Sequence, residues 1–307
     1  MSSPAVRRLA LASVVANSII VITGAAVRLT GSGLGCPTWP RCTETTITPT
    51  AEYAVHGVIE FANRLLTFVL LAVVVATLVA VWRQRPVRPG MRRLAVVGAL
   101  GIPAQAGLGG ITVLTGLNPW TVGLHLLLSM ALIAVAVVLH QRSREGDSPA
   151  VWLVASPLRG LAAGMLVLVA ATLAVGTVVT GSGPHSGDPE AGRNGLDPQA
   201  LSQLHADLVF LLVGVTLAFW LALRAIGGPS RPMGVLLGVL LAQGLVGFVQ
   251  YFTDLPVLLV GLHLVGACAV QIYAVHAVLA LRDRGALPAH PPVIHRRIAA
   301  VSGATGS

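Results

Sequence analysis

Three histidines, His125, His205 and His263, lie within long apolar stretches of the sequence. Each falls about five or six residues after the start of a predicted membrane-spanning helix, which places all three roughly 8 Å below the same membrane boundary. Ionisable side chains inside spans are costly and are candidates for function. A single buried histidine is more often a hydrogen-bonded structural residue, but three at one depth favour a chemical role.

Two of these histidines lie in the second half of the chain. His205 is on the predicted helix 200–223, and His263 is on the predicted helix 257–281. Imidazoles that face each other across a helix bundle can bind a haem iron from both sides. Such a pair leaves no open coordination position, which suits electron transfer. We therefore expect His205 and His263 to be the axial ligands of one haem.

The first half, which contains His125, also contains a carboxylate. On the predicted helix 54–82, helical spacing places His56, Glu60, and Asn63 or Arg64 on one face. Glu60 and Arg64 could form a buried ion pair, or the carboxylate could exchange protons with a bound substrate. The residues leave both interpretations open.

The composition shows which solvent these helices occupy. The chain has 307 residues, of which 55% are hydrophobic and only 10% are charged. Soluble domains carry roughly 25% charged residues, so this chain could not cover a surface in water. A spanning helix needs about 20 apolar residues. The segments that qualify are 9–30, 54–82, 94–115, 120–140, 158–180, 200–223, 233–252 and 257–281.

The arginines predict the orientation of the spans. All 20 basic residues are arginine, against 11 acidic residues. Sixteen lie on one side of the predicted membrane, and only Arg41 and Arg193 lie on the other. Short cytoplasmic loops retain positive charge, so we expect a multi-pass protein of the cell membrane with both termini cytoplasmic. The excess of positive charge therefore marks topology, and we expect membrane lipid and no nucleic acid as a partner.

An internal repeat predicts how the spans are grouped. Residues 104–126 align with residues 242–264 without gaps, and both stretches place Ala-Gln 20 residues before Gly-Leu-His-Leu. Four spans in each half give both halves the same orientation, as in a parallel repeat. We therefore predict an all-α integral membrane fold, with eight transmembrane helices in two pseudo-symmetric four-helix bundles. The expected units are an N-terminal bundle, a cytoplasmic linker, a C-terminal bundle and a disordered cytoplasmic tail, at 1–140, 141–157, 158–285 and 286–307.

Two cysteines lie in the first outer loop. Cys36 and Cys42 are separated by six positions in a segment rich in glycine and proline. A disulfide is permitted on the oxidising side of the membrane. Free thiols or a metal site are the alternatives, but no histidine neighbours the pair, which favours the bridge.

Together these elements resemble the haem A synthase family, whose multi-pass enzymes oxidise haem O to haem A for cytochrome oxidases. The resemblance extends to about residue 285 and is carried by several short motifs. They are the run Arg28-Leu29-Thr30-Gly31-Ser32-Gly33-Leu34 before the cysteine pair, Glu60-Phe61-x-x-Arg64, His125, Gln203-Leu204-His205-x-Asp207 and Gly261-Leu262-His263.

The resemblance implies a role for each half. It implies a haem b cofactor between His205 and His263, and a substrate haem in the N-terminal bundle at His125, with Glu60 as the catalytic residue. His56, Asn63 and Arg64 complete the expected substrate site. The implied reaction converts a porphyrin methyl group to a formyl group, and haem b passes electrons away. Haem O synthase (protohaem farnesyltransferase) and cytochrome oxidase assembly factors are the implied protein partners.

The sequence departs from the family pattern at one position. Asn63 stands where the family has a histidine directly before the arginine of the second helix. With this asparagine, the chain resembles an actinobacterial-like variant of the haem A synthase family. Either His125 alone holds the N-terminal haem, or His56 takes over part of the role.

Two other functions compete with this one. A di-haem b-type cytochrome that only transfers electrons would need full axial pairs in both halves, which Asn63 disfavours. A transporter would explain the repeat, but transporters usually show helices broken by glycine or proline at the membrane midplane. The polar residues of this chain instead cluster in the outer half of the spans and are chiefly histidine.

Overall fold

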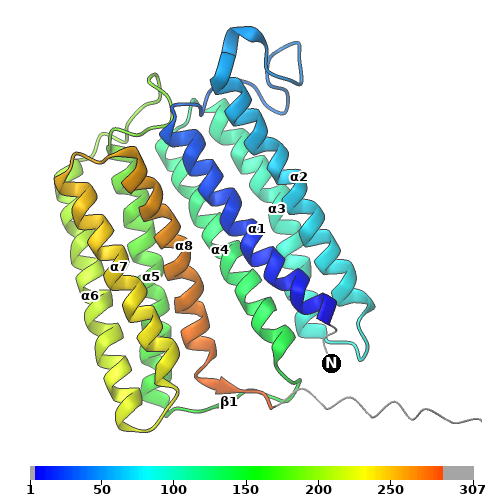
Figure 1. Cartoon of the computed structure of the whole chain (residues 1–307), viewed down its shortest axis with the longest axis vertical. Coiled ribbons are helices and arrows are strands. Elements are labelled where there is room, and N and C mark those ends of the chain that lie inside the picture. The colour runs from blue at the N-terminus through cyan, green and yellow to red at the C-terminus, as the bar shows by residue number, and fades with distance from the viewer. Residues whose placement is uncertain (1–3, 286–307) are drawn as a thin grey trace, which may run out of the picture.

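The computed structural model describes residues 4–285 and consists almost entirely of long helices (Figure 1). The tail predicted at 286–307 lies outside the described residues. One short 3-10 helix, η1 (Ala51–Tyr53), precedes the second long helix. The long helices are α1 (Pro4–Leu29), α2 (Ala54–Arg83), α3 (Pro89–Leu114), α4 (Pro119–Arg144), α5 (Ser156–Ser182), α6 (Pro198–Ala225), α7 (Ser230–Phe252) and α8 (Val257–Leu279).

All eight of these helices are long and apolar enough to cross a membrane. The prediction of an all-α multi-pass membrane protein is therefore confirmed. Several helices begin before the predicted apolar stretch, at a proline whose missing N–H is not needed in the first turn. Asn118 and Asp197 also cap α4 and α6, because their side chains accept the backbone N–H groups two residues later.

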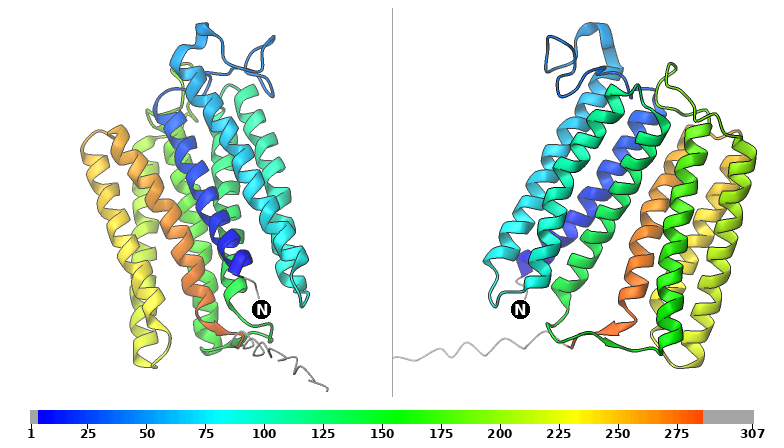
Figure 2. Two further views of the ribbon diagram at one scale, coloured as in Figure 1. Left: turned by 45° about the vertical axis from the view of Figure 1, so that its right-hand side comes forward. Right: turned by 180° about the vertical axis from the view of Figure 1, so that it is seen from behind.

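The helices form two groups that lie side by side (Figure 2). Helices α1 to α4 pack on one another, and α5 to α8 do the same. Between the groups, α4 packs on α8, α4 packs on α5 and α1 packs on α8. The repeat makes α4 equivalent to α8 and α1 equivalent to α5. The contact of α4 with α5 is therefore equivalent to the contact of α8 with α1. This pattern is that of a two-fold axis between α4 and α8.

The contact between the groups is apolar and tightly packed. Met130 and Ile133 of α4 lie in one buried cluster with Cys268 and Val275 of α8. The side chain of Gln271 also donates a hydrogen bond to the Met130 carbonyl, at 3.1 Å. Lipid supplies no hydrophobic force between helices, so van der Waals packing and such interhelical hydrogen bonds hold them together.

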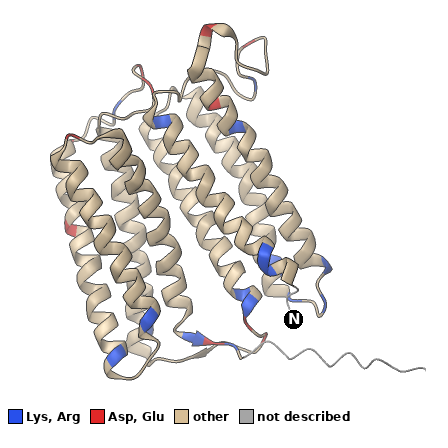
Figure 3. Cartoon of the chain, in the orientation of Figure 1, with Lys and Arg blue, Asp and Glu red and all other residues tan. Residues whose placement is uncertain are grey.

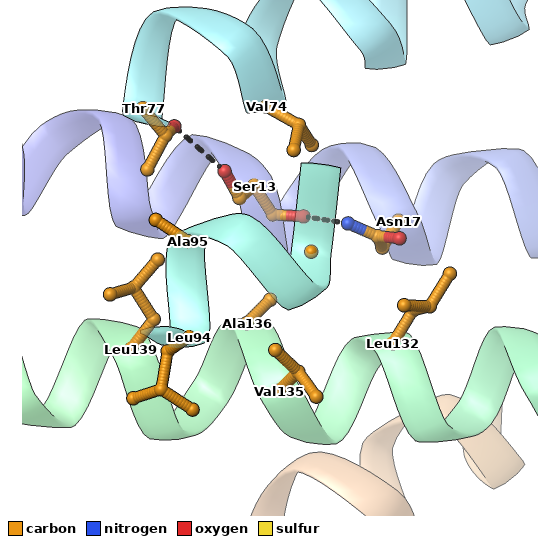
Figure 4. Close-up of a pocket in the computed structure, with 11 residues that line it drawn as sticks. Ser13, Asn17, Val74, Thr77, Leu94, Ala95, Leu132, Val135, Ala136 and Leu139 are labelled. Atoms are coloured by element: carbon orange, nitrogen blue, oxygen red, sulfur yellow. Dashed lines mark hydrogen bonds between the residues drawn. The ribbon is translucent and has the colours of Figure 1, made fainter. Parts of the chain in front are cut away.

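The first group also contains a small polar cluster between α1 and α2 (Figure 4). The hydroxyls of Ser13 and Thr77 lie 2.9 Å apart, and the Asn17 amide donates to the Ser13 carbonyl at 2.7 Å. These groups must pair within the protein because lipid offers no hydrogen bonds. They line a cavity with room for about one water molecule.

Two loops at one end of the helices, residues 30–50 and 183–197, connect the two groups. The sequence predicts that this end is the outer one, so they are called the first and second outer loops. The Arg28 guanidinium, at the end of α1, donates to the carbonyls of Thr180 (2.8 Å) and His185 (2.5 Å). The backbone N–H of Gly33 donates to the carbonyl of Gly187 at 2.8 Å. A residue of the first half therefore holds the second outer loop in place.

The opposite ends of the helices, which the sequence predicts to be the inner ends, are connected through charge and a short strand pair. Strand β1 (Val151–Trp152) pairs antiparallel with β2 (Arg282–Asp283), so the linker between the halves is attached to the end of α8. Arg88, before α3, pairs with Asp147 at 2.7 Å. Figure 3 shows that basic residues gather at this end, where the N-terminus also lies.

Candidate functional site

The structure brings His205 and His263 together. Their ring centroids lie 6.4 Å apart, with an angle of 65° between the ring planes. The three histidines noted in the sequence occur six or seven residues after the first residues of α4, α6 and α8, which places them about 9–10 Å along their helices.

Each of these rings lies against a glycine of the preceding helix. A Cβ atom built on Gly176 of α5 would lie 3.1 Å from Cε1 of His205. A Cβ built on Gly247 of α7 would lie 3.2 Å from Cε1 of His263. Both distances are shorter than ordinary van der Waals contact, so these positions accept the imidazoles because they carry no side chain.

The rings also have an unused ring nitrogen. The Nδ1 atoms of His125, His205 and His263 are buried and have no hydrogen-bond partner within the described part of the chain. Buried polar atoms without a partner are rare in native proteins. These Nδ1 atoms therefore take no part in holding the rings, whose Cε1 atoms pack against glycines.

The backbone that carries the histidines is supported by glutamine. The Gln243 side chain of α7 donates to the carbonyl of His263 at 2.7 Å, and the Gln105 side chain of α3 donates to the carbonyl of His125 at 2.9 Å. This contact explains why the repeat places a glutamine 20 residues before each histidine.

The first half has a single imidazole at the equivalent depth. A Cβ built on Gly109 of α3 would lie 3.1 Å from Cε1 of His125, as in the second half. On α2, Asn63 stands at the position where the resemblance leads us to expect a family histidine. Its Oδ1 accepts a hydrogen bond from Thr23 of α1 at 2.7 Å, and Gly24 lies beside its amide nitrogen.

His56 lies two helical turns outward of Asn63, about 10 Å away along the helix. Its side chain is exposed, and its Nδ1 lies 2.9 Å from the Ser32 hydroxyl of the first outer loop. The structure therefore connects His56 with the loop.

The first outer loop is closed by a disulfide. Cys36 and Cys42 are bonded, which confirms the predicted bridge. Both cysteines are buried, and the sulfur of Cys36 lies 3.9 Å from the Gly57 carbonyl oxygen at the start of α2. A Cβ on Gly35 would lie 2.3 Å from the carbonyl oxygen of His56, so only glycine allows the loop backbone to approach the helix this closely.

Glu60 and Arg64 hold this loop onto α2. One carboxylate oxygen of Glu60 accepts the Cys36 N–H at 2.7 Å, and the other pairs with Arg64 at 2.5 Å. Glu60 is only 5% exposed. Arg64 in turn donates to the carbonyls of Cys36, Thr38 and Arg41 at 2.8, 3.0 and 3.1 Å.

The loop also reaches α3 above His125. A Cβ on Gly110 would lie 2.5 Å from the Trp39 ring, so the indole rests on the α3 backbone. The adjacent residue, Gly109, contacts His125. Neighbouring glycines thus place the disulfide loop and the histidine next to each other.

Comparison with known proteins decides the family. The family model COX15-CtaA, described as cytochrome oxidase assembly protein, matches residues 7–185. The chain belongs to this family. The matched residues run from α1 to the second outer loop, and they include the disulfide loop, Glu60, Arg64 and His125.

Curated relatives resemble part of this chain. The heme A synthase of Shouchella clausii is 31% identical over 144 residues, which are 47% of each chain. That of Symbiobacterium thermophilum is 31% identical over 147 residues, 48% of this chain and 47% of the relative. That of Listeria welshimeri is 28% identical over 141 residues, 44% and 46% of the two chains. The chain thus spans about half the length of the curated relatives it matches.

Several residues of the site were not predicted from the sequence. Arg28 stood in a recognised motif, but its bonds to the second outer loop were not foreseen. No sequence pattern pointed to Thr23 or Gly176, because each contacts a residue of another helix. Gly109 and Gly247 were visible as a repeated pair, although the repeat does not say what they contact.

Proposed function

We propose that this protein is a haem A synthase, which oxidises a methyl group of haem O to the formyl group of haem A. The two unequal histidine sites are the observation that supports this function most strongly. One half has a facing pair of imidazoles, and the other has one imidazole beneath a loop held by a carboxylate and a guanidinium. An electron-transfer centre and a substrate site need such different environments.

The second half fits a haem b. Bonds between imidazole nitrogen and a transition metal are about 2 Å long, and the ring centre lies about 1 Å behind the nitrogen. Imidazoles on opposite sides of one metal therefore have ring centres about 6 Å apart. The observed 6.4 Å between His205 and His263 agrees with this spacing. Haem b bound there would supply one-electron redox chemistry.

In the first half, His125 would bind the iron of the substrate haem. Asn63 offers an amide already bonded to Thr23, and His56 is bonded at the loop, so His125 alone is the strong ligand in this proposal. One strong ligand suits a substrate that must enter and leave. Glu60 acts at the reacting edge, where it orients the methyl group or accepts a proton. Arg64 holds this carboxylate in place through their ion pair.

The charge distribution supports a location, and the proposed function implies partners. We place the protein in the cell membrane with both termini cytoplasmic, because sixteen arginines belong to the inner connections. The first bundle, 1–140, would bind haem O, and the second, 158–285, would bind haem b. Haem O synthase and cytochrome oxidase assembly factors are the proposed protein partners.

The test is to express the chain in cells that make haem O but have no haem A synthase of their own. Extracted haems are then separated by chromatography. We expect haem A to appear together with haem b in the purified protein. A purified protein with haem b, and with no haem A formed, would instead favour the di-haem electron-transfer cytochrome.

A valine at position 247 tests whether the glycine contact positions the haem b ligand. We expect Gly247→Val to lower haem b occupancy at least about twofold, because the new side chain must displace the His263 ring. Gly244→Val is the matched control on the same helix, since nothing lies within 4 Å of a Cβ there. The ratio of low-spin haem absorbance to protein measures the effect, and equal ratios in the two variants would contradict it.

A further inference from the structure

A basic groove opens between the inner ends of α1 and α4, at the opposite end of the bundle from the histidine sites. Its volume is about 590 Å³ when the space open to the surroundings is counted. Helices α1 and α4 pack directly on each other, so both walls are fixed. The groove is lined by Pro4, Arg7, Arg8 and Leu11 of α1 and by His140 and Arg144 of α4.

Among the described residues, the three arginines of this groove have no anionic partner. No carboxylate lies within ion-pair distance of Arg7, Arg8 or Arg144 across residues 4–285. The remaining segments, 1–3 and 286–307, contain no acidic residue at all. By contrast, the nearby carboxylates Glu145 and Asp147 pair with other arginines. Three like charges therefore line one groove, which favours an anion from outside the chain.

An apolar stripe leads from this groove into the membrane. Leu11, Val15 and Ile19 follow one another at intervals of four residues, so they lie on one face of α1. Each is 48% exposed. The face that carries the arginines at the membrane boundary thus continues as a strip of uncovered aliphatic side chains.

We infer that this surface is a binding site for an anionic phospholipid. The phosphate group lies among Arg7, Arg8 and Arg144, and an acyl chain lies along Leu11, Val15 and Ile19. Arginine binds phosphate through several N–H donors at once, and basic pockets at the cytoplasmic ends of spans are suited to anionic headgroups. A free phosphate ion would use the arginines and leave the stripe uncovered, whereas a lipid uses both.

The test compares lipid retention by the full-length protein in nanodiscs of mixed phosphatidylglycerol and phosphatidylcholine. After exchange into detergent, the bound lipids are extracted and quantified by mass spectrometry. We expect the triple variant R7Q/R8Q/R144Q to retain at least about tenfold less phosphatidylglycerol than the unmodified protein. The variant R7K/R8K/R144K keeps the charge and should retain most of it.

The matched control is R83Q/R85Q/R93Q, which removes the same charge from the same end of the molecule at the turn between α2 and α3. This control should retain phosphatidylglycerol normally. Equal loss from both triple variants, or loss from neither, overturns the inference. Excess inorganic phosphate should displace little lipid, and complete displacement would show that the groove binds the bare anion instead. Thermal unfolding of each variant verifies that the fold is intact.

Discussion

Replacing His263 with alanine is expected to abolish the low-spin haem b absorbance of the purified protein, and His205→Ala should do the same. The two rings lie 6.4 Å apart and form one site, so removal of either leaves the iron with a single protein ligand. Residues that act as a unit are strongly non-additive. The double variant should therefore be no worse than either single variant. Absorption spectra of the reduced protein, normalised to protein concentration, measure the loss.

Controls separate a lost ligand from a lost fold. His276→Ala alters the same helix at its inner end and should leave the spectrum unchanged. External imidazole should restore low-spin absorbance to the His263→Ala protein, because the space left beside Gly247 has the shape of the missing ring. If both single variants keep the full low-spin signal, the haem b assignment is wrong.

Replacing Glu60 with glutamine is expected to lower the yield of haem A about a hundredfold while haem b remains bound. Positioned acid–base groups typically contribute 10²–10⁴-fold to rate. Glutamine keeps an acceptor for the Cys36 N–H but loses the charge that pairs with Arg64. The measurement is the ratio of haem A to haem O in extracts from cells that supply haem O. Normal haem A yield with intact haem b would remove Glu60 from the mechanism.

A second variant distinguishes proton transfer from loop positioning. Arg64→Gln removes the donors to three loop carbonyls and leaves the carboxylate in place. If Glu60 acts only by holding the loop, the two variants should lose activity equally, with the same pH profile. If it also moves a proton, Glu60→Gln should lose more, and only this variant should flatten the pH profile. The control is Glu52→Gln, which removes an exposed carboxylate at the same end of the molecule.

Much of the architecture was predictable because lipid makes strict demands on a sequence. Charged groups are excluded from the hydrocarbon core, so long apolar stretches alone locate the eight helices. Depth along a helix is proportional to residue number, which is why His125, His205 and His263 could be placed at one level. The gapless repeat similarly predicted that the halves are equivalent, and the unequal residue at Asn63 predicted that they do not do the same chemistry.

The contacts between helices were decided only by the tertiary structure. Spacing along one helix places a residue on a face, but the rotation and pairing of helices depend on how all the side chains pack together. This is why the sequence identified Glu60 and Arg64 but left two interpretations open. The two side chains could form a buried ion pair, or the carboxylate could exchange protons with a bound substrate. In the folded chain, both side chains of α2 contact the disulfide loop. It also rests each histidine ring on a glycine more than fifteen residues away, a contact that requires two helices to approach closely.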